Sequence, residues 1–340
     1  MMIIRPAKIS DLDGLEKCAL KASSGLTHLP RDREALEAEI NESIQDLEKT
    51  ISEPKNEQYL FVLEDLKTND ICGTCGIISR TGASNPFYVF QIEKQKPYYF
   101  PEQKENSILR LYPYVNGPSE VCGLYLLPDY RHSGIGKLLS LSRFLFIAAH
   151  PNRFAKKVIA NMRGFIENNE SEFWNGIGQH FANFTLDEVM QYRIKHEKIA
   201  HHIFPPYPIN IPLLPEKVQN IIGKVHPNTQ PALNMLLAEG FAFTNEVDPF
   251  DGGPIISADV EQLRIFKEKK RSIVFDIVSK ELNSENYLVS NGRLDFRACF
   301  ASLEFRKNNE IIIDSNTAMS LNVNKGDSID YIICPSAKRG

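Results

Sequence analysis

The sequence predicts an α+β protein with a mixed central sheet and helices that flank it. Two β-rich runs, 59–65 and 71–78, are separated by the turn-forming residues 67–70, which predicts an antiparallel hairpin. The continuous apolar run at 120–127 is typical of a strand that is buried on both faces. Apolar residues at helical spacing follow at 137–149, so this strand leads through a loop into a helix that packs on the sheet.

The elements before this unit alternate between strands and helices. Residues 2–9 alternate in polarity and stop at Ser10, which predicts a strand that runs into an N-capped helix. The apolar stripe of this helix is expected at Leu12, Leu15, Ala19 and Leu20. A second, highly charged helix is expected at 31–51, and further strands are expected at 87–92 and 109–115.

The character of the chain changes after a short strand at 158–162. Residues 165 to about 222 combine helical patterns with a proline-rich stretch at 204–208, which predicts a helical insertion. A further helix at 231–239 ends at Gly240, which occupies the C′ position.

The last part of the chain is predicted to be rich in short strands. A charged helix is expected to reach about Arg271. The strands after residue 240 are expected at 241–247, 254–258, 287–289, 294–305, 311–313 and 328–333. We therefore expect one domain at 1–260 that contains the insertion at about 165–222. A helix and a small β-rich C-terminal extension follow at 261–340.

Composition and charge limit the possible classes of function. Of the 340 residues, 42% are hydrophobic and 24% are charged, which is ordinary globular composition. Lys and Arg total 39 against 43 Asp and Glu, so the net charge is -4. Bulk charge therefore gives no reason to bind nucleic acid or an anionic membrane. An anionic ligand must be bound by a local arrangement of donors.

The N-terminus and the cysteines indicate a cytoplasmic protein. Arg5 and Pro6 interrupt what would be the apolar region of a signal peptide, and the apolar stretch 144–149 is too short to cross a bilayer. The six cysteines are scattered, and the pair Cys72 and Cys75 has no second pair at zinc-ligand spacing. We expect reduced cysteines, no metal site, and neither a membrane nor a nucleic acid as partner.

The segment between the buried strand and the next helix gives the strongest indication of function. It has the pattern Arg131-x-x-Gly134-x-Gly136, and the helix is expected to begin at Lys137. Unpaired N–H groups in such a loop, together with the helix dipole, bind a phosphate or pyrophosphate. The glycines permit close approach, and Arg131 or Lys137 can add a charged contact. A simple strand–helix turn has the same spacing, whereas the glycine patterns of P-loops and Rossmann folds do not fit.

This loop, which follows a fourth strand, resembles the acyl-CoA pyrophosphate loop of the GCN5-related N-acetyltransferase (GNAT) superfamily. The hairpin at 59–78 and the helix at 228–241 lie where that superfamily has them, which implies a GNAT-like acyl-CoA N-acyltransferase fold. Longer stretches resemble the arginine N-succinyltransferase family. They are Met2-Ile3-Ile4-Arg5-Pro6, Gly25-Leu26-Thr27-His28-Leu29-Pro30, Phe61-Val62-Leu63-Glu64-Asp65, Met162-Arg163-Gly164, Phe173-Trp174, Gly223-Lys224-Val225-His226-Pro227 and Phe250-Asp251-Gly252-Gly253-Pro254. The resemblance runs in order along 1–260 and fades over about 281–340.

The resemblance implies a reaction and two site residues. The reaction is transfer of the succinyl group of succinyl-CoA to the α-amine of L-arginine in arginine catabolism, which releases CoA and N2-succinylarginine. It would proceed by direct attack in a ternary complex, with succinyl-CoA as co-substrate and no metal or bound cofactor. The succinyl-CoA contact of the family falls on Leu124, and its proton donor falls on His226.

Elementary chemistry supplies a role for both residues. A bulge at Leu124 would free its N–H group to bind the thioester carbonyl and the developing oxyanion. The imidazole of His226 can give a proton to the leaving thiolate at neutral pH. His132, inside the loop, is the competing histidine. Covalent catalysis by Cys122 is the weaker alternative, because a cysteine within a buried apolar strand tends to be inert.

The charged ends of the two substrates require partners of their own. Arg163, at the end of a strand, is a candidate for the succinyl carboxylate, which favours a bidentate guanidinium. The guanidinium of arginine requires carboxylates, for which Asp251, Glu120 or an acidic residue of the insertion are candidates. In a GNAT arrangement residues 23–27 would lie near the acceptor. Serines stand at positions 23 and 24, where the family usually has glycines.

Two other functions remain open at this level. An enzyme of the same fold could use another amine such as ornithine. A non-catalytic, acyl-CoA-binding subunit of a hetero-oligomer would retain the same loop. We expect a homo- or hetero-oligomer, and the sequence does not reveal the role of the C-terminal extension.

Overall fold

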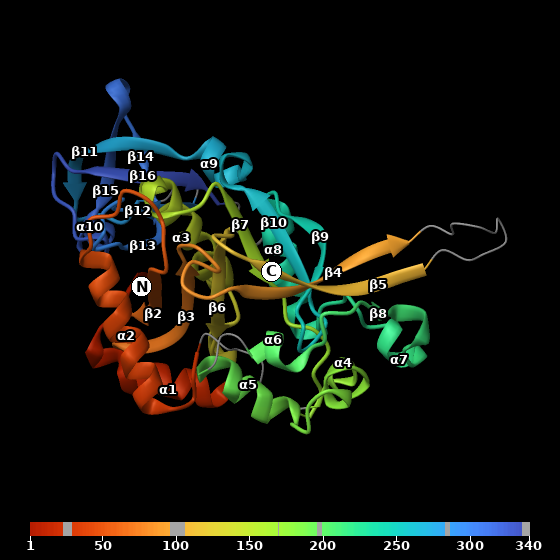
Figure 1. The fold of residues 1–340 in the computed structure, drawn as a ribbon. Coiled ribbons are helices and arrows are strands. Elements are labelled where there is room, and N and C mark those ends of the chain that lie inside the picture. Colours follow the sequence, from red (N-terminus) through yellow and green to blue (C-terminus); the bar gives the residue numbers. More distant parts are fainter. Residues whose placement is uncertain (23–28, 96–105, 169, 196–198, 283–285, 335–340) are drawn as a thin grey trace.

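The computed structural model describes residues 1–22, 29–95, 106–168, 170–195, 199–282 and 286–334, which share a single mixed sheet (Figure 1). Its strand order is β14-β15-β11-β16-β12-β13-β1-β2-β3-β6-β7-β10-β9-β4-β5-β8. The strands are β1 (Met2–Pro6), β2 (Gln58–Asp65), β3 (Asp70–Ile78), β4 (Phe87–Gln95), β5 (Asn106–Tyr114), β6 (Ser119–Leu126), β7 (Lys157–Asn161), β8 (Ile209–Asn210), β9 (Ala242–Val247), β10 (Pro254–Asp259), β11 (Lys270–Val278), β12 (Asn286–Ser290), β13 (Ala298–Ser302), β14 (Glu304–Phe305), β15 (Glu310–Asp314) and β16 (Ser328–Ile333). The helices are α1 (Leu12–Lys21), α2 (Arg33–Glu48), α3 (Ile135–Ala149), α4 (Glu172–Gly176), α5 (Leu186–Lys195), α6 (Ile199–Ile203), α7 (Glu216–Gln219), α8 (Gln230–Glu239), α9 (Arg264–Glu268) and α10 (Ser315–Leu321).

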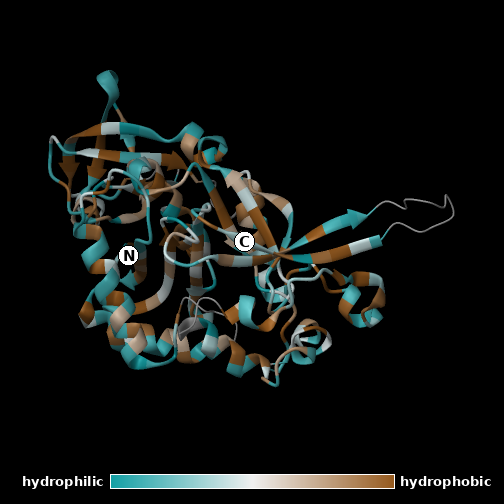
Figure 2. Cartoon of the chain, in the orientation of Figure 1, coloured by the Kyte–Doolittle hydropathy of each residue, from teal (hydrophilic) through white to brown (hydrophobic). Residues whose placement is uncertain are grey.

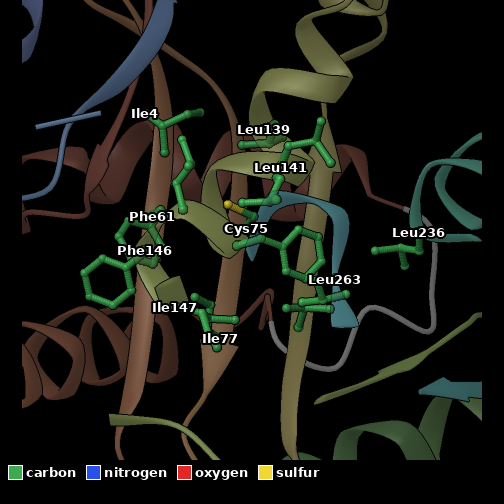
Figure 3. Packing of buried hydrophobic residues seen from close by; sticks show 14 of the residues in the cluster. Ile4, Phe61, Cys75, Ile77, Leu139, Leu141, Phe146, Ile147, Leu236 and Leu263 are labelled. Carbon is green, nitrogen blue, oxygen red and sulfur yellow. The ribbon is translucent and has the colours of Figure 1, made fainter. Parts of the chain in front are cut away.

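Helices cover both faces of the central strands. Strand β2 shows the two layers, because Tyr59 and Phe61 pack in one cluster with α3, whereas Leu60 and Val62 pack in another with α1 and α2. This is the alternation that a strand buried on both faces requires. Figure 3 shows Phe61 against Phe146 of α3, with ring centroids 5.0 Å apart. In Figure 2, α1 and α2 alternate between hydrophilic and hydrophobic residues, as helices with one buried face do.

The predicted N-terminal elements are present, with one error in detail. Strands β2 and β3 form the predicted antiparallel hairpin. In α1, Leu15 and Ala19 are buried, as expected for the stripe. Leu20 is 63% exposed, so its assignment to the stripe was wrong, and Cys18 is buried instead. Residues three and four apart share a helix face, which places Cys18 beside Leu15.

The predicted insertion contains α4, α5, α6, α7 and β8, and it packs around Trp174. The Trp174 ring stacks on Phe250 with centroids 6.0 Å apart, which ties the insertion to the turn between β9 and β10. The hairpin of β4 and β5 extends away from the body of the molecule (Figure 1). None of the described helices combines the length and the apolar character that crossing a bilayer would require.

The C-terminal strands continue the central sheet. Strand β13 pairs with β1 at Ala298 and Ile4, and Phe296 belongs to the same buried cluster as α3. The expected charged helix to about Arg271 was wrong, because α9 ends at Glu268 and the next residues form β11. Helix α10, capped by the Asp314 carboxylate, was not expected. The division into 1–260 and 261–340 stays a prediction.

Candidate active site

A β-bulge interrupts β6 beside Leu124. The register of β6 against β3 shifts between Cys122 and Tyr125. Gly123 and Leu124 therefore stand together opposite a single residue of β3, Cys75. Gly123 has a φ of 59°, a conformation that glycine adopts without strain. The bulge expected at Leu124 is present.

The bulge also changes which face of the sheet the side chains occupy. Val121 and Tyr125 are four residues apart and would share a face on a regular strand. In this strand Val121 packs with α3, whereas Tyr125 packs with α1 and α2. Leu124 packs against the α3 cluster, so its side chain serves the core and its backbone is the part available for chemistry.

Strands β6 and β7 diverge beside this bulge. They run parallel, and among the described residues their pairing ends at Glu120 and Ile159. Leu124 lies four residues beyond this pair on β6, and Arg163 lies four residues beyond it on the β7 side. These two residues therefore lie at about the same level of two separating backbones. The edge of β6 that faces the gap no longer carries a ladder to β7 there.

The loop after β6 presents backbone donors at the start of α3. Ser133 and Gly134 have φ values of 50° and 76°, and Gly134 is the residue that precedes the helix. The N–H groups of Ser133, Gly134 and Gly136 have no hydrogen-bond partner within the described part of the chain. The helix begins at Ile135 rather than at the predicted Lys137, so Gly136 lies in its first turn. Donors and helix dipole therefore converge on one point.

The space beside this helix start is open. A Cβ atom built on Gly134 or on Gly136 would meet no atom within 4 Å. The positive φ of Gly134 accounts for a glycine at that position. Neither packing nor backbone angle accounts for Gly136, so its missing side chain leaves room for a ligand. The loop thus has the features of an anion site rather than those of a simple turn.

The two cations of the loop differ in position. The Nε group of Arg131 donates to the Leu126 carbonyl oxygen at 2.9 Å, and its guanidinium lies 5.8 Å from the centre of the Tyr125 ring. These contacts hold an exposed cation beside the end of β6. Lys137 lies in the first turn of α3 and is half-buried.

His226 lies on the opposite side of the gap and is held by its backbone. Its N–H group donates to the Arg163 carbonyl oxygen at 3.0 Å, which joins it to the chain that leaves β7. Its Nδ1 atom accepts from the N–H group of Asn228 at 3.1 Å. The neutral ring therefore carries its proton on Nε2. Burial, together with the charge of Arg163, lowers the pKa of His226, so the ring is neutral at pH 7 and can donate from Nε2.

A glycine-to-glycine contact fixes the chain that carries Arg163. A Cβ on Gly253 would lie 2.0 Å from the Met162 carbonyl oxygen, so only hydrogen fits there. The carboxylate of Asp251 accepts from the N–H groups of Gly164 at 2.9 Å and Gly253 at 2.8 Å. Burial raises the pKa of Asp251 to about 7. Asp251 therefore holds this contact together from a buried position.

Arg163 itself retains an unused donor. Its Nη2 group donates to the Ile166 carbonyl oxygen at 3.2 Å, while its buried Nε group has no partner among the described residues. Burial lowers the pKa of Arg163, although the group stays charged at neutral pH. A carboxylate brought to this position would gain a charge-assisted bond.

Two carboxyl groups lie on the other side of the bulge. Glu120 of β6 is buried, and burial raises its pKa to about 7. Glu39 of α2 is half-buried, and burial followed by the charge of Glu42 raises its pKa to about 8. Both groups act electrostatically on Cys122, so they lie near each other. Sequence reasoning missed Glu39, because nothing distinguishes it from the other acids of a highly charged helix.

The competing catalytic residues are less suited to their roles. Burial raises the pKa of the Cys122 thiol well above its usual value, which opposes formation of a thiolate. His132 is exposed, and its Nδ1 atom lies 3.2 Å from the Ser133 hydroxyl. Residues 23–27, expected near the acceptor, lie outside the described residues.

The bulged strand, the anion loop and the splayed neighbour strand define a GNAT-type acyltransferase. The description "Arginine N-succinyltransferase beta subunit" applies to the family model that matches residues 2–265, and the model of its C-terminal domain matches 269–332. The chain belongs to the arginine N-succinyltransferase family. The expectation that the resemblance fades over about 281–340 was wrong, because the second match spans most of that region.

Individual relatives match over nearly the whole chain. The arginine N-succinyltransferase of Enterobacter sp. is 34% identical and covers 99% of both chains. The arginine N-succinyltransferase subunit alpha of Pseudomonas aeruginosa is 32% identical and covers 98% of this chain and 99% of the relative. A solved structure, the arginine/ornithine succinyltransferase subunit AI of Pseudomonas aeruginosa, superposes with a TM-score of 0.88 at 31% identity over 98% of each chain.

Proposed function

We propose that this chain transfers the succinyl group of succinyl-CoA to the α-amine of L-arginine, with release of CoA and N2-succinylarginine. The observation that carries the proposal is the placement of Leu124 and His226 at the same level of the gap between β6 and β7. One residue offers a backbone donor for a carbonyl oxygen, and the other offers a proton. Full-length membership of the family supports the choice of acyl donor and acceptor.

The chain supplies two binding elements for the acyl-CoA. The pyrophosphate lies at the start of α3, where the free N–H groups of Ser133, Gly134 and Gly136 converge, and Arg131 and Lys137 add positive charge. The thioester follows β6 into the gap, and its carbonyl oxygen accepts from the Leu124 N–H group. This bond strengthens as the oxygen becomes an oxyanion, so it lowers the barrier.

Proton transfer follows from the tautomer of His226. The neutral α-amine attacks the thioester carbon, the carbon–nitrogen bond forms, and collapse of the intermediate breaks the carbon–sulfur bond. The thiolate takes the Nε2 proton of His226, and the proton that the amine loses restores the imidazole. Direct transfer requires no covalent enzyme intermediate, in line with the raised pKa of Cys122.

Charged side chains account for recognition of the substrate ends. Arg163 meets a substrate carboxylate, either that of the succinyl group or the α-carboxylate of arginine. Glu39 and Glu120 meet the arginine guanidinium, whose charge would favour their ionised forms. Asp251 is assigned to holding the loops, because both of its oxygens already accept backbone N–H groups.

The decisive test is thiol release from the purified protein. Succinyl-CoA and acetyl-CoA are each offered with arginine, ornithine and other amines. We expect the fastest release with succinyl-CoA and arginine. No release with this pair would contradict the proposal. Ornithine belongs in the panel because the solved relative is described as an arginine/ornithine succinyltransferase subunit.

Assembly and location remain predictions of the same proposal. A homo- or hetero-oligomer is expected, and light scattering coupled to size-exclusion chromatography measures it. If the chain is a non-catalytic subunit, it binds succinyl-CoA in calorimetry without releasing thiol. A cytoplasmic location, where CoA thioesters are available, is expected and is tested by cell fractionation.

A further inference from the structure

Arg143, in the middle of α3, is a buried cation that the proposed mechanism does not use. It is 2% exposed, and no carboxylate pairs with it among the described residues. Its Nε and Nη2 groups donate back to Ser140, one turn earlier in the same helix, at 3.0 Å each. Its Nη1 group reaches the carbonyl oxygen of Cys122 on β6 at 3.4 Å, the long limit for such a bond.

The other buried arginines of the described chain are fully compensated. Arg5 forms ion pairs with Asp11 and Glu64, each at 2.6 Å. Arg153 donates from Nη1 to the Asp46 carbonyl oxygen and to the Tyr59 hydroxyl, each at 3.0 Å, and from Nη2 to further carbonyls. These arginines join separate elements with most of their donors. Arg143 does not, so a purely structural role leaves its charge and its unused donors without an explanation.

We propose that Arg143 binds the free carboxylate of the succinyl group and so selects a dicarboxylic acyl-CoA. This inference rests on the proposed function and names the residue that reads the acyl chain. It leaves Arg163, beside His226, for the α-carboxylate of the acceptor.

Position along β6 supports this assignment. Arg143 contacts Cys122, which precedes Leu124 by two residues, and two residues of strand span at most about 7 Å. With its carbonyl oxygen at the Leu124 N–H group, a succinyl chain extends its carboxylate by about 4 Å, and a charge-assisted bond adds about 3 Å. The guanidinium is therefore within reach. The CoA pyrophosphate is not, because Gly134 lies nine residues earlier and about 13 Å away along α3.

The test compares succinyl-CoA with butyryl-CoA, which has the same four-carbon chain without the carboxylate. We expect Arg143→Met and Arg143→Gln to lower the succinyl-to-butyryl ratio of kcat/KM about 100-fold, mainly through loss of the succinyl-CoA rate. Arg143→Lys should lower it about 10-fold, because lysine offers a point charge rather than a planar fork. Arg153→Met is the matched control, which should reduce stability and leave the ratio unchanged.

The outcomes separate this inference from the proposed function. A loss that affects both acyl-CoA substrates equally would show that Arg143 is structural, and an unchanged ratio in any folded variant would overturn the proposal. Calorimetry without acceptor gives a second readout that does not depend on which amine is used. Wild-type protein should bind succinyl-CoA more tightly than butyryl-CoA, and Arg143→Gln should abolish the difference. Equal affinities in the wild-type protein would overturn the proposal whether or not the variants fold.

Discussion

Replacement of His226 by asparagine separates its two roles. The Nδ1 atom of His226 accepts from the Asn228 N–H group, so the ring caps the turn that precedes α8. Loss of such a cap costs about 1 kcal/mol. Its Nε2 atom is the proposed acid, and a general acid contributes roughly 10²–10⁴-fold, which is about 3–5 kcal/mol of barrier. His226→Ala loses both roles, whereas His226→Asn retains a side-chain oxygen for the cap and lacks the acid.

We expect both variants to lower kcat by roughly 10²–10⁴-fold, with little change in affinity for succinyl-CoA. The proton moves only as the intermediate breaks down, so binding in the ground state does not depend on it. Only His226→Ala should lose stability, by about 1 kcal/mol. Thiol release under saturating substrates measures kcat, calorimetry measures affinity, and urea unfolding measures stability. His132→Ala, at an exposed loop position, is the control and should weaken CoA binding at most modestly.

The contrast between the two variants decides between acid catalysis and loop support. If His226→Asn turns over at nearly the wild-type rate while His226→Ala does not, the histidine acts as a cap and the acid must be sought elsewhere. If both retain the wild-type rate, the residue has no part in the mechanism.

The remaining predictions address the anion loop, the acceptor acids and the C-terminal strands. Gly136→Val should keep its fold by circular dichroism, since the added side chain meets no protein atom, and should lose CoA affinity in calorimetry; unchanged affinity would reduce the loop to a turn. Glu39→Gln should raise the KM for arginine about 10-fold and leave the KM for succinyl-CoA unchanged, and an equal rise in both would contradict the assignment. Buried Glu120 holds its proton to about pH 7 in the folded state but only to about 4.5 when unfolded, so stability falls by about 3 kcal/mol as pH rises across this window. Urea unfolding of Glu120→Gln should show a correspondingly smaller fall, and an unchanged slope would refute it. Phe296→Ala should cost about 3–5 kcal/mol, because the ring packs on Phe61 and Phe146 at 5.7 and 5.3 Å, and a cost below 1 kcal/mol would show that the C-terminal strands are not coupled to the core.

The strand–loop–helix unit was predictable because each of its parts has a strong local signal. The apolar run of β6, the two glycines of the loop and the helical spacing of α3 agree with one another. Strand β11 was missed because its apolar residues lie on both faces. Val274 is buried, while Ile273 and Phe275 are 47% and 45% exposed, so the period of two that marks a half-buried strand is hidden.

The site could be predicted only where a residue type implies its own chemistry. His226 and Arg163 carry that information in their side chains. Leu124 does not, because its role depends on a bulge that one positive φ at Gly123 produces. Arg143 was missed because an arginine between the apolar positions of a helix usually reaches solvent, and only the packing of α3 on the sheet shows that it is buried.

The pairing of Ile4 with Ala298 has a consequence for how the chain is made. During synthesis, β1 leaves the ribosome long before its neighbour β13 exists. At about 5–20 residues per second, one edge of β1 stays uncovered for roughly 15–60 s. An unpaired strand edge is a template for association with other chains. Nascent chains that stop before Ala298 are therefore the species most exposed to aggregation, and a chaperone that covers the edge of β1 during this interval would raise the yield of folded protein.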